Sequence, residues 1–294
     1  VKELSPKVAV IENVGGLQDN HPDALKKIID DLEDTGYTVN TISLNAADYR
    51  VPQERTRVFV VGIRNDIRLP DQWEPPTVRQ ADPNQLTFAS MKGDSEQLRG
   101  YRTAGEALED LPPPLAPQPP ADDPVHTVSA HNDRKVTPHS CGEWLDPDQL
   151  DQYTRDELNV EHRDEPVLMP PNHIEADHQQ STREKMAGWE RGCSINETTR
   201  RLESDAISPT ITVSEGTPPV HYQGRTPDND EPINTVRRLT VREAARLQTF
   251  EDHWCFAGDK KSRYQQVGNA VPPLLAEHLG DHLRRTILRP DATM

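Results

Sequence analysis

Short apolar runs and one amphipathic segment dominate the first 65 residues. Residues 7–11 form an apolar run that ends in Glu12-Asn13-Val14-Gly15-Gly16, which predicts a buried strand opening into a glycine-bearing loop. Apolar residues recur at helical spacing over residues 22–34. Residues 38–44 alternate and residues 57–63 are more continuously apolar, so both predict strands. The order strand, helix, strand indicates an α/β fold, here the later part of an open sheet.

From about residue 69 to past residue 200 the chain is polar and interrupted by proline pairs and triplets. Two short elements are expected in or just after it, a helix at residues 105–111 and a half-buried strand at residues 208–214. Helical order returns after Thr240. Thr240 followed three residues later by Glu243 is typical of a capping box, and a final helix is expected over residues 272–288.

Composition narrows the class of protein. The 294 residues are 33% hydrophobic and carry a net charge of −16. No apolar run approaches the roughly 18 residues that span a bilayer, so a cytoplasmic protein is expected. The acidic charge is unusual for a protein that binds nucleic acid. Two explanations stay open: an ordinary acidic protein, or adaptation to a high-salt cytoplasm, where screening shortens repulsion from DNA.

Cysteine and histidine spacing argues against metal and disulfide chemistry. Cys141, Cys193 and Cys255 are far apart and form no CxxC pair, so they are expected to be spectator thiols. His173 and His178 together with Cys193 match no common ligand pattern, so no metal site is expected.

Three short motifs can carry chemistry. Glu12 is a carboxylate at the end of a strand, which by itself is a weak signal. Arg55 and Arg57 lie two apart on or beside a strand and therefore share a face, an arrangement that suits a base carbonyl and a phosphate. The pair Gly268-Asn269 alone predicts only a turn.

Taken together, these segments resemble DNA (cytosine-5) methyltransferases. Residues 237–250 and 263–273 resemble the last two motifs of that family, and residues 12–14 and 49–64 match two further motifs in the family's order. The resemblance implies a partial Rossmann-like methyltransferase sheet with an inserted, irregular target recognition domain. The corresponding domains are residues 1–68 and 237–294 for the catalytic part and 69–236 for target recognition.

The resemblance also implies roles for individual residues. Glu12 would face a cytosine flipped out of the duplex, where a carboxylic acid bonded to N3 and the exocyclic amine stabilises charge as a thiolate attacks C6. Arg57 would contact the cytosine O2, with Arg55 in support. Asn269 and Val271 would lie beside the S-adenosylmethionine pocket. Recognition loops vary with the DNA sequence that is read, so the target sequence is not predicted.

Two elements of the family are absent from these 294 residues. The Phe-x-Gly-x-Gly cofactor loop is missing, and none of the three cysteines follows a proline as the family's nucleophile does. The expectation is the C-terminal part of an enzyme that acts on double-stranded DNA, often with a partner restriction nuclease. Such a part is expected to be inactive without an N-terminal half, supplied as a separate chain or a missing segment. The alternative is a non-catalytic DNA-binding remnant. RNA as substrate is disfavoured by the long region between the motifs.

Overall fold

The chain forms two compact units, residues 1–101 with 271–294, and residues 102–270. The boundaries at residues 68 and 236 and the assignment of residues 69–236 to target recognition, which the family resemblance implies, stay predictions. The computed structural model describes residues 1–67, 73–78, 100–111, 114, 143–145, 167–170, 172–195, 199–212, 218–252 and 254–288. Cys141 and the proline pair at residues 119–120 lie outside the described residues.

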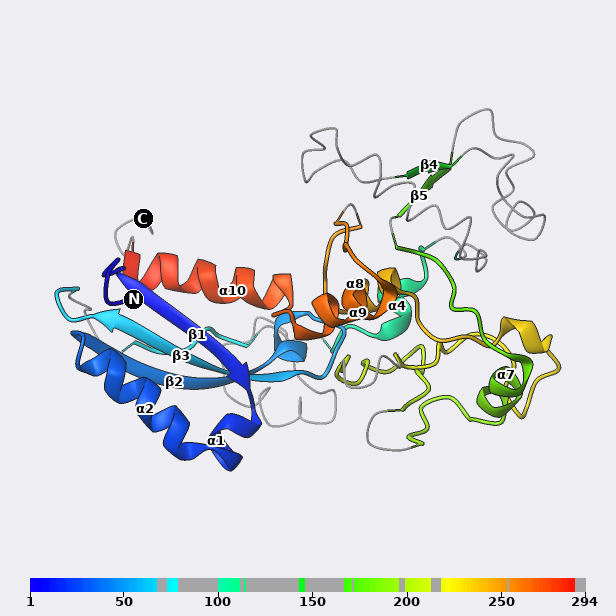
Figure 1. Ribbon diagram of the computed structural model, residues 1–294, viewed down its shortest axis with the longest axis horizontal. Coiled ribbons are helices and arrows are strands. Elements are labelled where there is room, and N and C mark those ends of the chain that lie inside the picture. The colour runs from blue at the N-terminus through cyan, green and yellow to red at the C-terminus, as the bar shows by residue number, and fades with distance from the viewer. Residues whose placement is uncertain are drawn as a thin grey trace. The chain divides into compact units, whose positions relative to one another are not determined.

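The first unit is built on a three-stranded sheet in the order β1-β3-β2 (Figure 1). Its strands are β1 (Val8–Val14), β2 (Tyr37–Asn45) and β3 (Thr56–Arg64). The central strand β3 pairs antiparallel with both neighbours. Burial explains this position, because β3 carries the longest uninterrupted run of buried side chains, residues 58–63. The expected strands at residues 38–44 and 57–63 are confirmed.

One expectation for this sheet was wrong. The residues Glu12-Asn13-Val14, expected to open a loop, continue β1 as its last three positions. The ladder to β3 runs on through them, with Glu12 opposite Phe59 and Val14 opposite Arg57. The backbone hydrogen bonds of this ladder outweigh the weak loop signal of the two glycines that follow. Chain reversal begins only at α1 (Gly16–Asn20).

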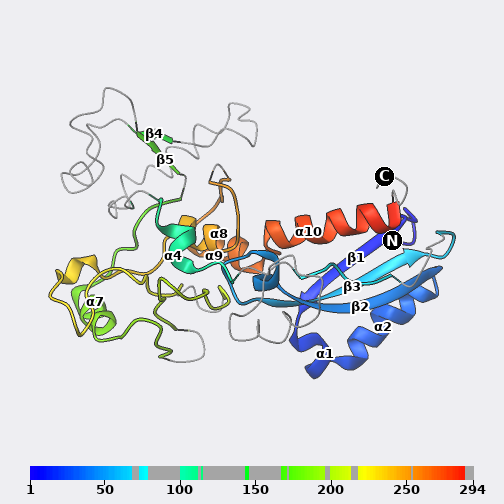
Figure 2. The same ribbon diagram turned by 180° about the vertical axis from the view of Figure 1, so that it is seen from behind.

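Helices cover both faces of the sheet (Figures 1 and 2). One face packs on α2 (Pro22–Glu33), as expected from its periodicity. The other packs on α10 (Pro273–Leu283), which continues as the π-helical turn η6 (Arg284–Leu288) and confirms the final helix. The apolar core under α10 includes Leu44, Phe59, Val61, Ile63, Leu275, Leu279 and Leu283. The first unit is therefore a three-layer α/β/α arrangement.

The second unit packs short helices around a separate core. It contains α4 (Ala104–Leu108), α7 (Gln180–Ala187), η5 (Ile233–Thr235), α8 (Val241–Leu247), α9 (Lys260–Asn269) and the antiparallel strands β4 (Glu143–Leu145) and β5 (Val167–Met169). The expected helix at residues 105–111 is thus shorter and begins one residue earlier. The expected strand at 208–214 is not formed in its described part, residues 208–212. None of the helices in the described part of the chain has the length and hydropathy to cross a bilayer.

Candidate active site

Glu12 and Arg57 form an ion pair on the α10 side of the sheet. Arg57 lies opposite Val14 and Glu12 lies opposite Phe59, so the two side chains are diagonal neighbours on one face. The Nε of Arg57 lies 3.0 Å from Oε1 of Glu12, and the side chains are 12% and 26% exposed. The pair is therefore held at the end of the sheet and still reachable from solvent. The register of β1 and β3 brings these two predicted residues together.

Arg55 is held one residue before β3 by a short 3₁₀ turn, η1 (Ala46–Tyr49). The side-chain oxygen of Asn45 caps this turn and also accepts a hydrogen bond from the Arg55 amide at 3.2 Å. Arg55 itself is 1% exposed. Burial and then the neighbouring Arg57 lower the pKa of its guanidinium, Glu12 partly offsets both, and the resulting pKa is about 10. Arg55 remains a cation near neutral pH, close enough to the Glu12–Arg57 pair to share its electrostatics.

Asn45 was not singled out from the sequence, although it positions Arg55. The available signal was its place as an N-cap residue immediately after an alternating strand. A cap of that kind is common, so the pattern alone does not distinguish it from an ordinary turn.

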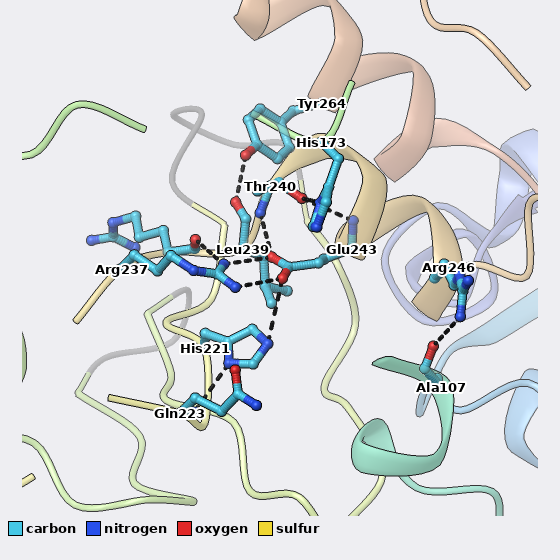
Figure 3. Close-up of polar contacts among 11 residues, drawn as sticks. Ala107, His173, His221, Gln223, Arg237, Leu239, Thr240, Glu243, Arg246 and Tyr264 are labelled. Carbon is cyan, nitrogen blue, oxygen red and sulfur yellow. Dashed lines mark hydrogen bonds and ion pairs between the residues drawn. The ribbon is translucent and has the colours of Figure 1, made fainter. Parts of the chain in front are cut away.

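The second unit contains a buried polar network centred on Glu243 (Figure 3). Arg237 donates two hydrogen bonds to its carboxylate, at 2.8 Å to Oε2 and 2.7 Å to Oε1. Thr240 and Glu243 bond reciprocally, which confirms the predicted capping box at the start of α8. Burial alone raises the pKa of Glu243, but Arg237 and then His221 more than offset it, so the net pKa is lowered.

Two histidines, His221 and His173, border this network. His221 accepts a hydrogen bond at Nδ1 from the Gln223 amide, which leaves its Nε2 facing Glu243 at 3.5 Å. Burial lowers the pKa of His221 well below its ordinary value despite that carboxylate. The Nδ1 of His173 lies 2.9 Å from the Thr240 hydroxyl. The network therefore fixes the fold around α8.

The two histidines considered above as metal ligands bond other groups of the protein. His178 accepts the amide of Arg238 at Nε2, while His173 bonds Thr240. In the described part of the chain, no three His, Cys, Asp or Glu residues are grouped so that they could hold a metal ion.

The two predicted cofactor residues differ in their surroundings. Asn269 is exposed at the end of α9 in the second unit. Val271 is partly buried against the core under α10 in the first unit. The contact of each residue with S-adenosylmethionine stays a prediction.

The family model for C-5 cytosine-specific DNA methylases matches residues 1–285. The chain belongs to this family. Among curated relatives it is 30% identical over 291 residues to the type II methyltransferase M.XorII of Xanthomonas oryzae pv. oryzae, covering 98% of this chain. It is 28% identical over 315 residues to the type II methyltransferase M.DdeI of Desulfomicrobium norvegicum, covering 96% of this chain. The chain spans 60% and 64% of the lengths of these two relatives.

A solved structure supports the fold. The crystal structure of a DNA modification methyltransferase encoded within an E. coli prophage aligns with a TM-score of 0.60 at 20% identity, covering 97% of this chain and 71% of that chain. At this identity the likeness shows the mixed α/β methyltransferase fold, which agrees with the fold class expected from the sequence.

Proposed function

We propose that the chain supplies the base-binding and DNA-reading parts of a DNA (cytosine-5) methyltransferase. The complete reaction moves the methyl group of S-adenosylmethionine to C5 of a cytosine flipped out of duplex DNA. The observation that carries the proposal is the Glu12–Arg57 pair, a carboxylate and a guanidinium held 3.0 Å apart at the end of a sheet that stays accessible. Family membership indicates the reaction class, methyl transfer, and the Glu12–Arg57 pair offers hydrogen-bonding groups that suit cytosine.

The pair is complementary to the Watson–Crick edge of cytosine. That edge presents a donor at the exocyclic amine, an acceptor at N3 and an acceptor at O2. A carboxyl group can bond the amine and N3, while a guanidinium donates to O2. Attack of a thiolate on C6 moves electrons toward N3, where Glu12 stabilises the developing charge. The buried cation Arg55 adds a fixed positive field beside the same base.

The two residues of the chain that are predicted to bind the cofactor would contact only one edge of it. The exposed amide of Asn269 offers a donor and an acceptor, and Val271 offers an apolar contact. S-adenosylmethionine supplies the electrophilic methyl group when bound. No Phe-x-Gly-x-Gly loop of the family's form is among the 294 residues, so further residues are needed to enclose the cofactor.

The nucleophile has no candidate in this sequence. None of the three cysteines follows a proline, and all three lie after Glu12 in the chain. We therefore propose that methyl transfer needs a Pro-Cys loop and a glycine-rich loop from other residues, as an N-terminal methyltransferase half would provide. The purified 294-residue polypeptide is expected to transfer no methyl group from labelled S-adenosylmethionine to DNA. Robust transfer by it alone would refute this part of the proposal.

Glu12 is tested in the enzyme complemented with the two missing loops. Glu12→Gln should fold and bind DNA like the parent but lose a stabilising contact in the transition state, which costs about 3–4 kcal/mol or roughly 100- to 1000-fold in rate. Asp66→Asn is the matched control, because Asp66 is a solvent-exposed carboxylate paired with Arg64 at the far end of β3. Activity of Glu12→Gln within threefold of the parent would remove Glu12 from the reaction.

Arg57 is tested by binding rather than by rate. Arg57→Ala should weaken binding to duplexes that carry a mismatched, easily extruded cytosine more than binding to the matched duplex, because the contact forms only with the flipped base. If Arg57→Ala binds both duplexes as the parent does and reacts at the parent's rate, Arg57 has only a structural role.

A second candidate function is DNA binding without catalysis. The second unit favours it, because α8, α9 and the Glu243 network form a core of their own. DNA binding without methyl transfer, even after both missing loops are supplied, would select this candidate.

A further inference from the structure

Four extended segments of the second unit lie side by side through backbone hydrogen bonds. They are residues 193–195, 199–202, 219–222 and 236–239, joined in that order. The last two are antiparallel, with His221 donating to Arg237 and Leu239 donating to Pro219. They form an irregular hairpin whose connecting loop is residues 223–235. Arg201, in the second segment, reaches this loop with its side chain.

Arg201 is a buried cation whose guanidinium, among the described residues, bonds backbone carbonyl groups and no side chain. It is 1% exposed, and burial lowers the pKa of its guanidinium. Its Nη1 donates to the carbonyls of Trp189 at 3.0 Å and Arg225 at 2.8 Å, and more weakly to Met186 at 3.4 Å. Its Nη2 donates to the carbonyls of Gln223 and Gly224, each at 3.1 Å. No carboxylate among the described residues lies within ion-pair distance of it.

Three consecutive carbonyls, those of residues 223 to 225, are thus held by one guanidinium. A buried charge is costly unless it is bonded, so the carbonyl contacts of the two Nη atoms stabilise a single backbone shape for the turn, although the Nε has no partner among the described residues. Gly224 adopts φ +86°, and a Cβ there would lie 2.4 Å from the Thr235 carbonyl oxygen. The Arg225 amide donates to the Thr235 hydroxyl at 3.1 Å. The turn is therefore fixed from both sides.

The same turn directs two long polar side chains outward. Gln223 and Arg225 are exposed, with the buried Gly224 between them. Within the described residues, neither side chain makes a hydrogen bond or ion pair, whereas Arg201 and seven further arginines of this unit bond protein groups through their guanidinium groups. These seven are Arg102, Arg183, Arg191, Arg237, Arg238, Arg242 and Arg246. A rigid backbone with free side chains is what directional recognition requires.

The net charge of the loop distinguishes contacts to DNA phosphates from contacts to base edges. Arg225 is followed by Asp228, Asp230 and Glu231, so residues 223–235 carry more negative than positive charge. Such a loop gains nothing from the general attraction of phosphates. Arginine and glutamine are the side chains that read guanine and adenine by paired hydrogen bonds at base edges in the major groove.

We propose that the turn Gln223–Arg225, positioned by the buried Arg201, is a specificity-determining element that reads base edges of duplex DNA. The inference rests on the proposed function, because it presumes that this unit binds DNA. Arg225 reads a guanine, Gln223 reads an adenine, and Arg201 acts through them as a positioning residue.

The experiment selects binding sites with the purified 294-residue chain. A library of duplexes with a randomised segment is bound, recovered and sequenced for the parent, Arg225→Lys, Arg225→Ala, Gln223→Ala and the control Lys185→Ala. Lys185 is an exposed cation on α7, so its loss matches the charge change of Arg225→Ala. Arg225→Lys keeps the charge but cannot bond O6 and N7 of guanine in the same geometry. It should reduce the preference for guanine at one position by roughly 5- to 100-fold.

The remaining outcomes are distinct. A preference kept in Arg225→Lys but an affinity lost in Arg225→Ala, with a smaller salt dependence, would show a phosphate contact and overturn the proposal. Unchanged preferences in every variant, or a parent that binds without preference, would also overturn it and leave the proposed function standing. A parent that binds no duplex at all would refute the proposed function itself.

Arg201 is tested by amide exchange alongside the same selection. In Arg201→Lys, exchange should accelerate over residues 223–235 and not in α8 or α9, and the guanine preference should fall as in Arg225→Lys. Acceleration through α8 as well would mean global loss of stability and would overturn the positioning role. Unchanged exchange in the loop would overturn it too.

Discussion

Replacing Glu243 by glutamine removes one charge from the centre of the buried network and keeps the shape of the side chain. The parent carboxylate accepts two hydrogen bonds from Arg237 and one from the Thr240 amide. In Glu243→Gln, a side-chain amide group faces the guanidinium, and one acceptor oxygen is lost. Arg237 then stays buried without its counter-charge.

The magnitude follows from this burial. Glu243 is 2% exposed and Arg237 is 9% exposed, so water cannot replace the lost partner without rearrangement. Breaking a buried pair from one side costs about 3–5 kcal/mol. With an m-value of about 2 kcal/mol per M for urea, a loss of about 4 kcal/mol lowers the unfolding midpoint by about 2 M. That is a large part of the about 5–15 kcal/mol by which a domain is stable.

Urea unfolding at pH 7, followed by intrinsic tryptophan fluorescence, measures the change. Asp252→Asn is the control, because its pair with Arg246 is partly exposed and should cost at most about 1 kcal/mol. The double variant with Arg237→Met removes both charges and should be more stable than Glu243→Gln alone. A loss below about 1 kcal/mol for Glu243→Gln, or a double variant that is less stable still, would refute the reasoning.

Three further outcomes are expected. Folding should be favoured by salt, because a net charge of −16 repels itself at low ionic strength; a melting temperature that does not rise between about 0.1 and 3 M KCl, where the Debye length falls from about 10 Å to below 3 Å, contradicts this. Burial lowers the pKa of His178 to about 4, so the unfolded chain binds a proton below about pH 6.5 that the folded chain does not. Stability should therefore fall from pH 6.5 to 4, by less than the about 1.4 kcal/mol per pH unit of a fully buried group because solvent screens the half-buried His178, and less steeply in His178→Gln; equal slopes would exclude His178 as the cause. Leu279→Ala in α10 should cost about 2–5 kcal/mol in the first unit, measured by Trp73 fluorescence during urea unfolding, and a cost below about 1 kcal/mol would mean that the cavity collapses.

Local pattern predicts the elements of this fold better than their ends. Helix α2 and strands β2 and β3 follow directly from periodicity, and the capping box follows from Thr240 and Glu243. The end of β1 was placed too early because its last residues are held by long-range pairing with β3 rather than by local propensity. Strand length here depends on a partner about 45 residues away in the sequence, as the pairing of Glu12 with Phe59 shows.

The candidate site shows the same division. Spacing places Arg55 and Arg57 on one face, but the distance from Arg57 to Glu12 depends on the register of two strands, which no local pattern specifies. From the sequence, only the family resemblance predicted that Arg57 and Glu12 belong to one site. The positioning contacts of Asn45 and Arg201 carry no comparable sequence signal, because each acts through backbone groups whose residue types are arbitrary.

The arginines of the second unit explain how an acidic chain can still belong to a DNA-modifying family. Arg201 and Arg242 direct their guanidinium groups to backbone carbonyls, and Arg237 and Arg246 direct theirs to carboxylates within the unit. These cations stabilise the fold, so they add little to the attraction between the protein and phosphate groups. Under the two proposals above, DNA binding would depend on a few outward side chains with short-range, directional contacts, such as Arg225. Such binding should be less sensitive to salt than that of a basic protein, because fewer counterions are released for each complex formed.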